Sequence, residues 1–289
     1  MTFAKYLPTI YLIPRHTRIV KSICLTLLIF GITFAYFFPI LYMFLTGFKT
    51  EIEAVSPKIL FTPTLTTFRK VLQNSDLFAN LVNSIFQVIL GTFLSLMLGV
   101  PAAFALVFGK FKKPDTADRL YFWFITTILL PPVAVLIPLY TTFQVTNLNK
   151  TPLGLLLAYV GFHIPIVVWM CHSFFKDIPP EIMEAAQIDG CTRWDQFVRI
   201  GLPLTRAGQM SAGLLVAVFI WNEFFLGFNL TTNETATLPV FMARFREQQD
   251  MFTAQLSAST TLAILPAIIL GWISQKSLAK GLTLGAIKG

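Results

Sequence analysis

Six apolar runs, each about as long as a helix that crosses a lipid bilayer, most restrict how this 289-residue chain can fold. A bilayer core of about 30 Å needs about 20 mostly apolar residues in helical form. Backbone polar groups in that core must be hydrogen-bonded within the protein, which favours helices. The sequence therefore predicts an all-α membrane protein with six transmembrane helices. The expected spans are 23–48, 81–108, 120–143, 153–175, 208–230 and 254–273.

The composition argues against a water-soluble domain. Only 12% of the residues are charged and the mean hydropathy is +0.69, whereas about a quarter of a soluble domain is charged. The three cysteines provide no disulfide framework. The first run could instead be a signal peptide, but it is too long and no A-x-A cleavage pattern follows it. We therefore expect one membrane domain over residues 23–275.

The distribution of lysine and arginine predicts the orientation of the spans. With the N-terminus in the cytoplasm, roughly twice as many basic residues lie inside as outside, which the positive-inside rule favours. Residues 1–22 are then a cytoplasmic lead-in, and 276–289 are a cytoplasmic tail. The net charge of +8 is explained by this topology, because the basic residues flank apolar runs. We expect membrane lipid as a partner of this chain, and we expect no nucleic-acid partner.

A polar segment at about 176–207 separates the fourth and fifth runs, and its first half predicts a short helix. Proline is favoured in the first turn of a helix, so the helix should run from about 180 to 188. Asp189-Gly190 should end it, with Gly190 in the left-handed conformation that glycine adopts after a helix. Ile182, Ala185 and Ala186 are expected on one face, where small side chains would let another protein approach closely.

The second half of the segment predicts another short helix. Thr192 followed three residues later by Asp195 fits a capping box, so this helix should run from about 193 to 200. Gly201 and Pro203 should stop it. The segment is expected to be a cytoplasmic docking element. The alternative is an amphipathic loop on lipid headgroups, but such helices usually carry Lys and Arg on the polar face, and this one carries acids.

Several motifs resemble the permease subunits of ABC importers. The polar segment is similar to their EAA loop, and two further regions resemble the carbohydrate, maltose-type group. The stretches with this resemblance are Glu184-Ala185-Ala186, Asp189-Gly190, Leu202-Pro203-Leu204, Trp221-Asn222-Glu223-Phe224-Phe225, Leu238-Pro239 and the tail from Lys280 to Gly289. Proline is common in the family at the position of Ala207, which is a minor departure.

The resemblance implies a permease subunit of an ATP-driven importer of a sugar, oligosaccharide or polyol in the cytoplasmic (inner) membrane of a bacterial or archaeal cell. It implies a second permease subunit in a heterodimer, two ATP-binding subunits and an extracytoplasmic solute-binding protein. ATP and Mg would be bound by the ATP-binding subunits, with no cofactor or metal on this chain. The residues implied in coupling to the ATPase are Glu184, Ala185, Ala186, Asp189, Gly190 and Pro203.

The motifs that are missing agree with a transport subunit that is not itself an enzyme. No G-x-x-x-x-G-K-[ST] phosphate loop, H-E-x-x-H or G-x-S-x-G occurs in the sequence. Two alternatives remain open. One is an ABC importer for another solute, such as an amino acid or a polyamine. The other is a self-contained secondary transporter, although such proteins usually show internal repeats.

A few polar residues in the spans are candidates for the substrate pathway. Glu223 is the only acid deep in an apolar run, and a buried charge there usually faces a cavity or a partner. The alternative is a protonated or headgroup-facing carboxyl. Asn222 and Tyr140 are the other candidates. In the outer loop at about 231–253, Arg244 and Arg246 are expected to contact the binding protein.

Overall fold

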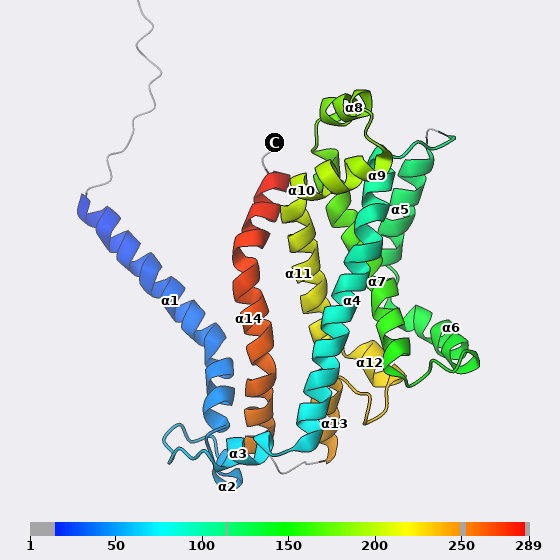
Figure 1. Cartoon of the computed structure of the whole chain (residues 1–289). Coiled ribbons are helices and arrows are strands. Elements are labelled where there is room, and N and C mark those ends of the chain that lie inside the picture. The colour runs from blue at the N-terminus through cyan, green and yellow to red at the C-terminus, as the bar shows by residue number, and fades with distance from the viewer. Residues whose placement is uncertain (1–14, 114, 249–252, 287–289) are drawn as a thin grey trace, which may run out of the picture.

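The computed structural model describes the backbone of residues 15–113, 115–248 and 253–286, and the side chains of 22–113, 115–244, 253–269 and 271–272. All regular elements in these ranges are helices, which confirms the predicted all-α class (Figure 1). The elements are α1 (Arg15–Thr46), α2 (Glu51–Ala54), α3 (Thr66–Leu72), α4 (Ser75–Phe108), α5 (Thr116–Ile128), α6 (Pro132–Val145), α7 (Pro152–Lys176), α8 (Pro180–Ile188), α9 (Arg193–Asp195), the π-helix η1 (Gln196–Gly201), α10 (Leu202–Leu204), α11 (Arg206–Asn222), α12 (Phe225–Leu230), α13 (Leu238–Gln248) and α14 (Thr253–Ala286).

Several helices have the length and composition to cross a membrane. Three such helices lie in the described part of the chain: Ser22–Thr46 within α1, all of α4 and all of α7. The number rises to five if each of two bent helix pairs counts as one crossing. The segment Thr253–Ile269 of α14 is a shorter apolar helix. The first, second and fourth apolar runs therefore form membrane-length helices, as the hydropathy indicates.

The third apolar run is two helices, so the prediction of one unbroken transmembrane helix over 120–143 was wrong. Helices α5 and α6 meet at an angle of 96°. The chain turns at Pro131, which has extended backbone angles, and Pro132 begins α6. A proline has no N–H to continue a helix and disfavours helical angles in the residue before it. Two consecutive prolines therefore break the run.

The fifth apolar run is also interrupted, so a single helix over 208–230 was wrong as well. Helix α11 ends at Asn222, and α12 begins at Phe225. Between them Glu223 has extended backbone angles (φ −71°, ψ 119°). The side chain of Glu223 accepts hydrogen bonds from the first turns of α12, as described below, which stabilises the new helix start.

The core of the molecule lies where α4, α7 and α11 pack together (Figure 1). Small side chains let these helices approach closely. At Gly99 of α4, a Cβ would lie 2.6 Å from Cγ1 of Val167 and 3.3 Å from the backbone oxygen of Ile164 on α7. Such distances are below van der Waals contact, so the α4–α7 seam requires glycine at this position.

We predict that Gly99→Ala destabilises the subunit by about 1–3 kcal/mol, the usual cost of overpacking a core. This cost exceeds the gain of at most about 1 kcal/mol from replacing glycine by alanine in a helix. The measurement is thermal unfolding of the purified subunit in detergent. Gly161→Ala on α7 is the control, because its Cβ would meet no atom within 4 Å. Equal unfolding temperatures for the two variants would contradict the close approach.

The two ends of the bundle differ. Helices α8, α9 and α10 lie at one end, where α1 begins and α14 ends (Figure 1). Helices α2, α3, α12 and α13 lie at the opposite end. The chain thus places both described ends of its backbone on the side of the polar segment, as the predicted topology requires.

Candidate functional site

Helix α8 projects from one end of the bundle and ends as the sequence predicts (Figure 1). Its bounds, Pro180–Ile188, match the expected range, and Gly190 has a left-handed φ of 81°. The N–H of Cys191 donates to the oxygen of Ala186 (2.9 Å), and the N–H of Gly190 donates to that of Gln187 (3.1 Å). These two bonds form a Schellman motif, which satisfies carbonyls at the helix end.

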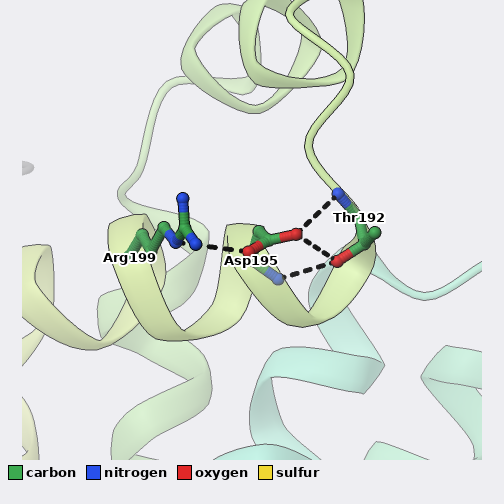
Figure 2. Close-up of polar contacts among 3 residues, drawn as sticks. All are labelled: Thr192, Asp195 and Arg199. Atoms are coloured by element: carbon green, nitrogen blue, oxygen red, sulfur yellow. Dashed lines mark hydrogen bonds and ion pairs between the residues drawn. The ribbon is translucent and has the colours of Figure 1, made fainter.

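The predicted capping box is present directly after this turn (Figure 2). The N–H of Asp195 donates to Oγ1 of Thr192 (3.1 Å), and the N–H of Thr192 donates to Oδ2 of Asp195 (3.2 Å). Nε of Arg199 lies 3.2 Å from the other carboxylate oxygen. The hydrogen bonds from the Thr192 side chain and backbone hold the pKa of Asp195 below its usual value, so the cap is charged at neutral pH.

The faces of α8 are not divided as expected. Glu184 and Ala185 are exposed, whereas Ala186 is buried together with Met183. Ala186 therefore packs inside this chain, and the prediction that it shares an open face with Ala185 was wrong. The helical spacing alone could not decide this, because 185 and 186 both lie within one turn of 182 and either can face inward.

Sequence reasoning missed Ile188, the most exposed apolar residue of the segment. Its side chain is 86% exposed, and Ile182 on the same helix is 40% exposed. Ile182, Ala185 and Ile188 recur every three residues, and all three are exposed. We call these three residues the apolar face of α8. Asp189 and Gly190 follow it and are also exposed.

The second predicted helix starts at Arg193 as expected, but it differs in type and length. After α9 the chain forms the π-helix η1, in which the N–H of Leu202 donates to the oxygen of Phe197, five residues back. The helical path continues through α10 to Leu204, so the prediction that Gly201 and Pro203 stop it was wrong. Pro203 stands in the first turn of α10, where its missing N–H is tolerated, and its side chain is exposed.

Aromatic side chains tie this segment to the bundle. The ring of Phe197 in η1 lies 5.1 Å from that of Phe104 on α4 and 5.5 Å from that of Trp194. The Phe104 ring also lies 5.4 Å from that of Phe175 on α7. Phe197 and Phe175 are buried. Direct aromatic packing therefore joins the segment to α4 and α7.

Glu223 lies at the break between α11 and α12, and three donors surround its carboxylate. The N–H groups of Leu226 and Gly227 donate to its two oxygens at 2.8 and 3.0 Å. The hydroxyl of Tyr159, on α7, donates at 2.9 Å. Tyr159 is fully buried. Glu223 thus connects the start of α12 to α7.

The other candidates for a substrate pathway are placed separately. The exposed Asn222 lines a small cavity of about 140 Å³ between the end of α11, α13 and α14, and its side-chain amide donates to the oxygen of Val218 (2.8 Å). Tyr140 is on α6, where its hydroxyl accepts a hydrogen bond from Gln144 (2.9 Å). The structure gives no contact that joins Tyr140 to Asn222 or Glu223 in the described residues.

Arg244 is held by its own chain. Its guanidinium donates to Oδ1 of Asn233 (2.8 Å) and to the oxygen of Thr231 (3.4 Å), and it lies 5.6 Å from the ring centroid of Phe228. These contacts fasten α13 to the loop before it. The side chain of Arg246 lies outside the described residues. The expected contact of either arginine with a binding protein therefore stays a prediction.

The described residues thus form an all-helical domain with membrane-length helices, a projecting helix α8 and a capping box directly after it. Comparison with known protein families identifies the family of this chain. The model of the binding-protein-dependent transport system inner membrane components matches residues 91–284. The chain belongs to this family.

The chain is also similar to individual members of transport systems, and its fold is similar to that of a chain in a solved structure. The chain is 32% identical to the sulfoquinovosyl glycerol transport system permease protein SmoH of Agrobacterium fabrum, over 87% of this chain and 89% of that protein. It is 30% identical to the trehalose transport system permease protein SugB of Mycobacterium tuberculosis, over 87% and 92%. A crystal structure of a bacterial ABC transporter that imports the acidic polysaccharide alginate contains a chain of similar fold, with a TM-score of 0.75, 22% identity, and 91% and 98% coverage.

Proposed function

We propose that this chain is the permease subunit of an ATP-driven ABC importer that carries a sugar, oligosaccharide or polyol across the cytoplasmic membrane. Family membership supports the transport role. The carbohydrate class is supported by the relatives, since SmoH is named for a sugar glycoside and SugB for trehalose. An importer of another solute class is the second candidate, because the coupling motifs do not depend on the solute.

The proposed topology has six crossings and both termini in the cytoplasm. The crossings are α1, α4, the pair α5–α6, α7, the pair α11–α12, and α14. Residues 23–275 form the membrane domain, with 1–22 and 276–289 on the cytoplasmic side. The placement of α8 at the same end as the start of α1 and the end of α14 supports this assignment (Figure 1).

The observation that supports the coupling role best is the apolar face of α8. Ile188 lies in the last turn of α8, and together with Ile182 and Ala185 it forms an exposed apolar surface of the kind that another protein can cover. We assign this cover to one of two ATP-binding subunits, which bind ATP and Mg. Ala185 belongs to this face, and Glu184, Asp189 and Gly190 border it. Pro203 lies on α10 and is assigned to the border of the site, whereas Ala186 supports it from within.

The proposed transport path lies between this chain and a second permease subunit, with a solute-binding protein at the opposite end of the bundle. Asn222 is the candidate solute contact, because its amide borders a cavity. Tyr140 is a second candidate on α6. Arg244 and Arg246 lie on α13 at the end assigned to the binding protein. Glu223 is assigned to positioning α12, for the reasons argued in the Discussion.

The test is reconstitution of the complete complex from this chain, the second permease, the ATP-binding subunits and the binding protein in liposomes. Uptake of labelled disaccharide or polyol that requires ATP and the binding protein is expected. Uptake of amino acids or polyamines instead would favour the second candidate. Uptake by this chain alone without ATP would contradict the proposal.

A further inference from the structure

We infer that Glu51 is a positioning residue that sets the direction of helix α1 by capping helix α14 from a distant part of the chain. The geometric inference stands on the contacts below. Its consequence for transport rests on the proposed importer function.

Helix α1 stands apart from the bundle over most of its length. Every side chain from Ser22 to Leu41 is exposed. In Figure 1, α1 meets the rest of the molecule at its Thr46 end, beside α14 and α3, and diverges from α14 toward its start. Because the described packing of α1 is confined to this end, its direction must be set by the residues that join it to α2.

Glu51, at the start of α2, is bound to the start of α14. The N–H of Ala254 donates to Oε2 of Glu51 at 2.9 Å, and the N–H of Gln255 donates to Oε1 at 2.9 Å. The first N–H groups of an α-helix have no partner within the helix, and a carboxylate is favoured there by the helix dipole. Both oxygens of one side chain therefore hold a helix of 34 residues.

Lys49 fixes the backbone immediately before Glu51. Its side chain is fully buried, and Nζ donates to the oxygen of Lys58 at 2.7 Å. The ammonium also lies 4.9 Å from the ring centroid of Tyr42 on α1 and 5.2 Å from that of Phe61. The backbone oxygen of Lys49 accepts a hydrogen bond from Thr67 on α3 at 2.8 Å. Lys49 thus joins the end of α1, the loop between α2 and α3, and α3 itself, two residues before Glu51.

The neighbouring carboxylate has a different role: it caps its own helix α2 and accepts a hydrogen bond from Thr62 in the loop that follows (3.2 Å). Glu53 forms the capping box of α2 with Thr50, in which Oε2 accepts the Thr50 N–H and Oγ1 of Thr50 accepts the Glu53 N–H, both at 3.4 Å. The Thr50 backbone hydrogen bond is the main cause that lowers the pKa of Glu53. Glu53 is therefore a matched control: it is also a glutamate of α2, but it does not cap α14.

The consequence concerns which helices move together. Helix α14 packs along α11, and α11 follows directly after the coupling segment. A fixed joint between α1 and α14 makes α1 follow α11 and α14 during the transport cycle rather than α4 and α7. In the proposed importer, Glu51 thereby determines the direction of α1 relative to α14 in the membrane.

The experiment measures the distance between spin labels on α1 and α14 in the assembled complex in lipid nanodiscs. Labels are placed at Phe30 and Ile268, which are both exposed, after replacement of the three native cysteines. The wild type should give one narrow distribution. Glu51→Ala should add a longer population, with the ratio of joined to separated states falling about tenfold, as expected for the loss of a charge-assisted hydrogen bond.

The control Glu53→Ala should give the same distance distribution as the wild type. An unchanged distribution in Glu51→Ala, or equal broadening in both variants, would overturn the inference. If Glu51→Ala does not assemble, Glu51→Gln is measured by hydrogen exchange at the amides of Ala254 and Gln255, where faster exchange than in Glu53→Gln is expected and equal exchange overturns the inference. Failure of the wild-type complex to import sugar would count against the proposed function and leave these measurements valid.

Discussion

Replacing Ile188 with lysine is expected to remove the ATP-binding subunits from the complex while the permease itself stays folded. Ile188 is 86% exposed in the isolated chain, so its substitution removes no internal packing. At a docked interface, an apolar anchor of this kind typically contributes about 2 kcal/mol or more. Its replacement by a charge should therefore weaken retention of the ATP-binding subunits by at least about 30-fold.

Lysine is chosen because it stabilises helix α8 and at the same time places a charge on the apolar face of α8. A lysine at 188 stands four residues after Glu184, the arrangement in which opposite charges stabilise a helix. It also lies in the last turn of α8, where a positive charge is favoured by the helix dipole. A loss of binding therefore cannot be ascribed to unfolding of α8.

The measurement is co-purification of the ATP-binding subunits with the tagged permease, together with ATP-dependent uptake. Ile52→Lys is the matched control, because Ile52 is 88% exposed but lies on α2 at the opposite end of the molecule (Figure 1). The control should retain the ATP-binding subunits. Full retention in Ile188→Lys would show that the apolar face of α8 is not the docking surface.

Local features of this fold were predictable from the sequence because they depend on few neighbouring residues. The length of apolar runs predicted α4 and α7 to within a turn or two at each end. The left-handed Gly190 and the capping box of Thr192 and Asp195 are set by residues within four positions of each other. Such patterns need no knowledge of the tertiary structure.

Features that depend on distant partners were not predictable in the same way. The break after Asn222 is stabilised by Glu223, whose carboxylate is bound in part by Tyr159 on another helix. The inward direction of Ala186 depends on packing of α8 against the bundle. The link from Glu51 to α14 joins residues about 200 positions apart. A single sequence contains no short-range signal for any of these three contacts.

The contacts of Glu223 lead to the second large effect. Glu223→Gln is expected to destabilise the subunit by about 1.5–3 kcal/mol, the usual contribution of hydrogen bonds to a charged group. Its amide nitrogen would face an N–H of α12 in place of an oxygen, so one donor of Leu226 or Gly227 loses its acceptor. Tyr159→Phe, which removes the hydroxyl and leaves the buried ring, should cost about 1 kcal/mol. Uptake should fall in parallel, because α12 is no longer held to α7.

A double-mutant cycle shows whether the two residues act through one contact. The free-energy changes of unfolding for Tyr159→Phe and Glu223→Gln should be non-additive by about 0.5 kcal/mol or more, as for residues in direct contact. Tyr140→Phe is the control, because the hydroxyl of Tyr140 lies on α6, accepts a hydrogen bond from Gln144 and has no described contact with Glu223. Additive free-energy changes of unfolding would show that Tyr159 and Glu223 do not act through one contact. Full stability of Glu223→Gln together with lost uptake would return Glu223 to the role of a solute contact, since a ligand-binding carboxylate can be neutralised without unfolding the helix that it precedes.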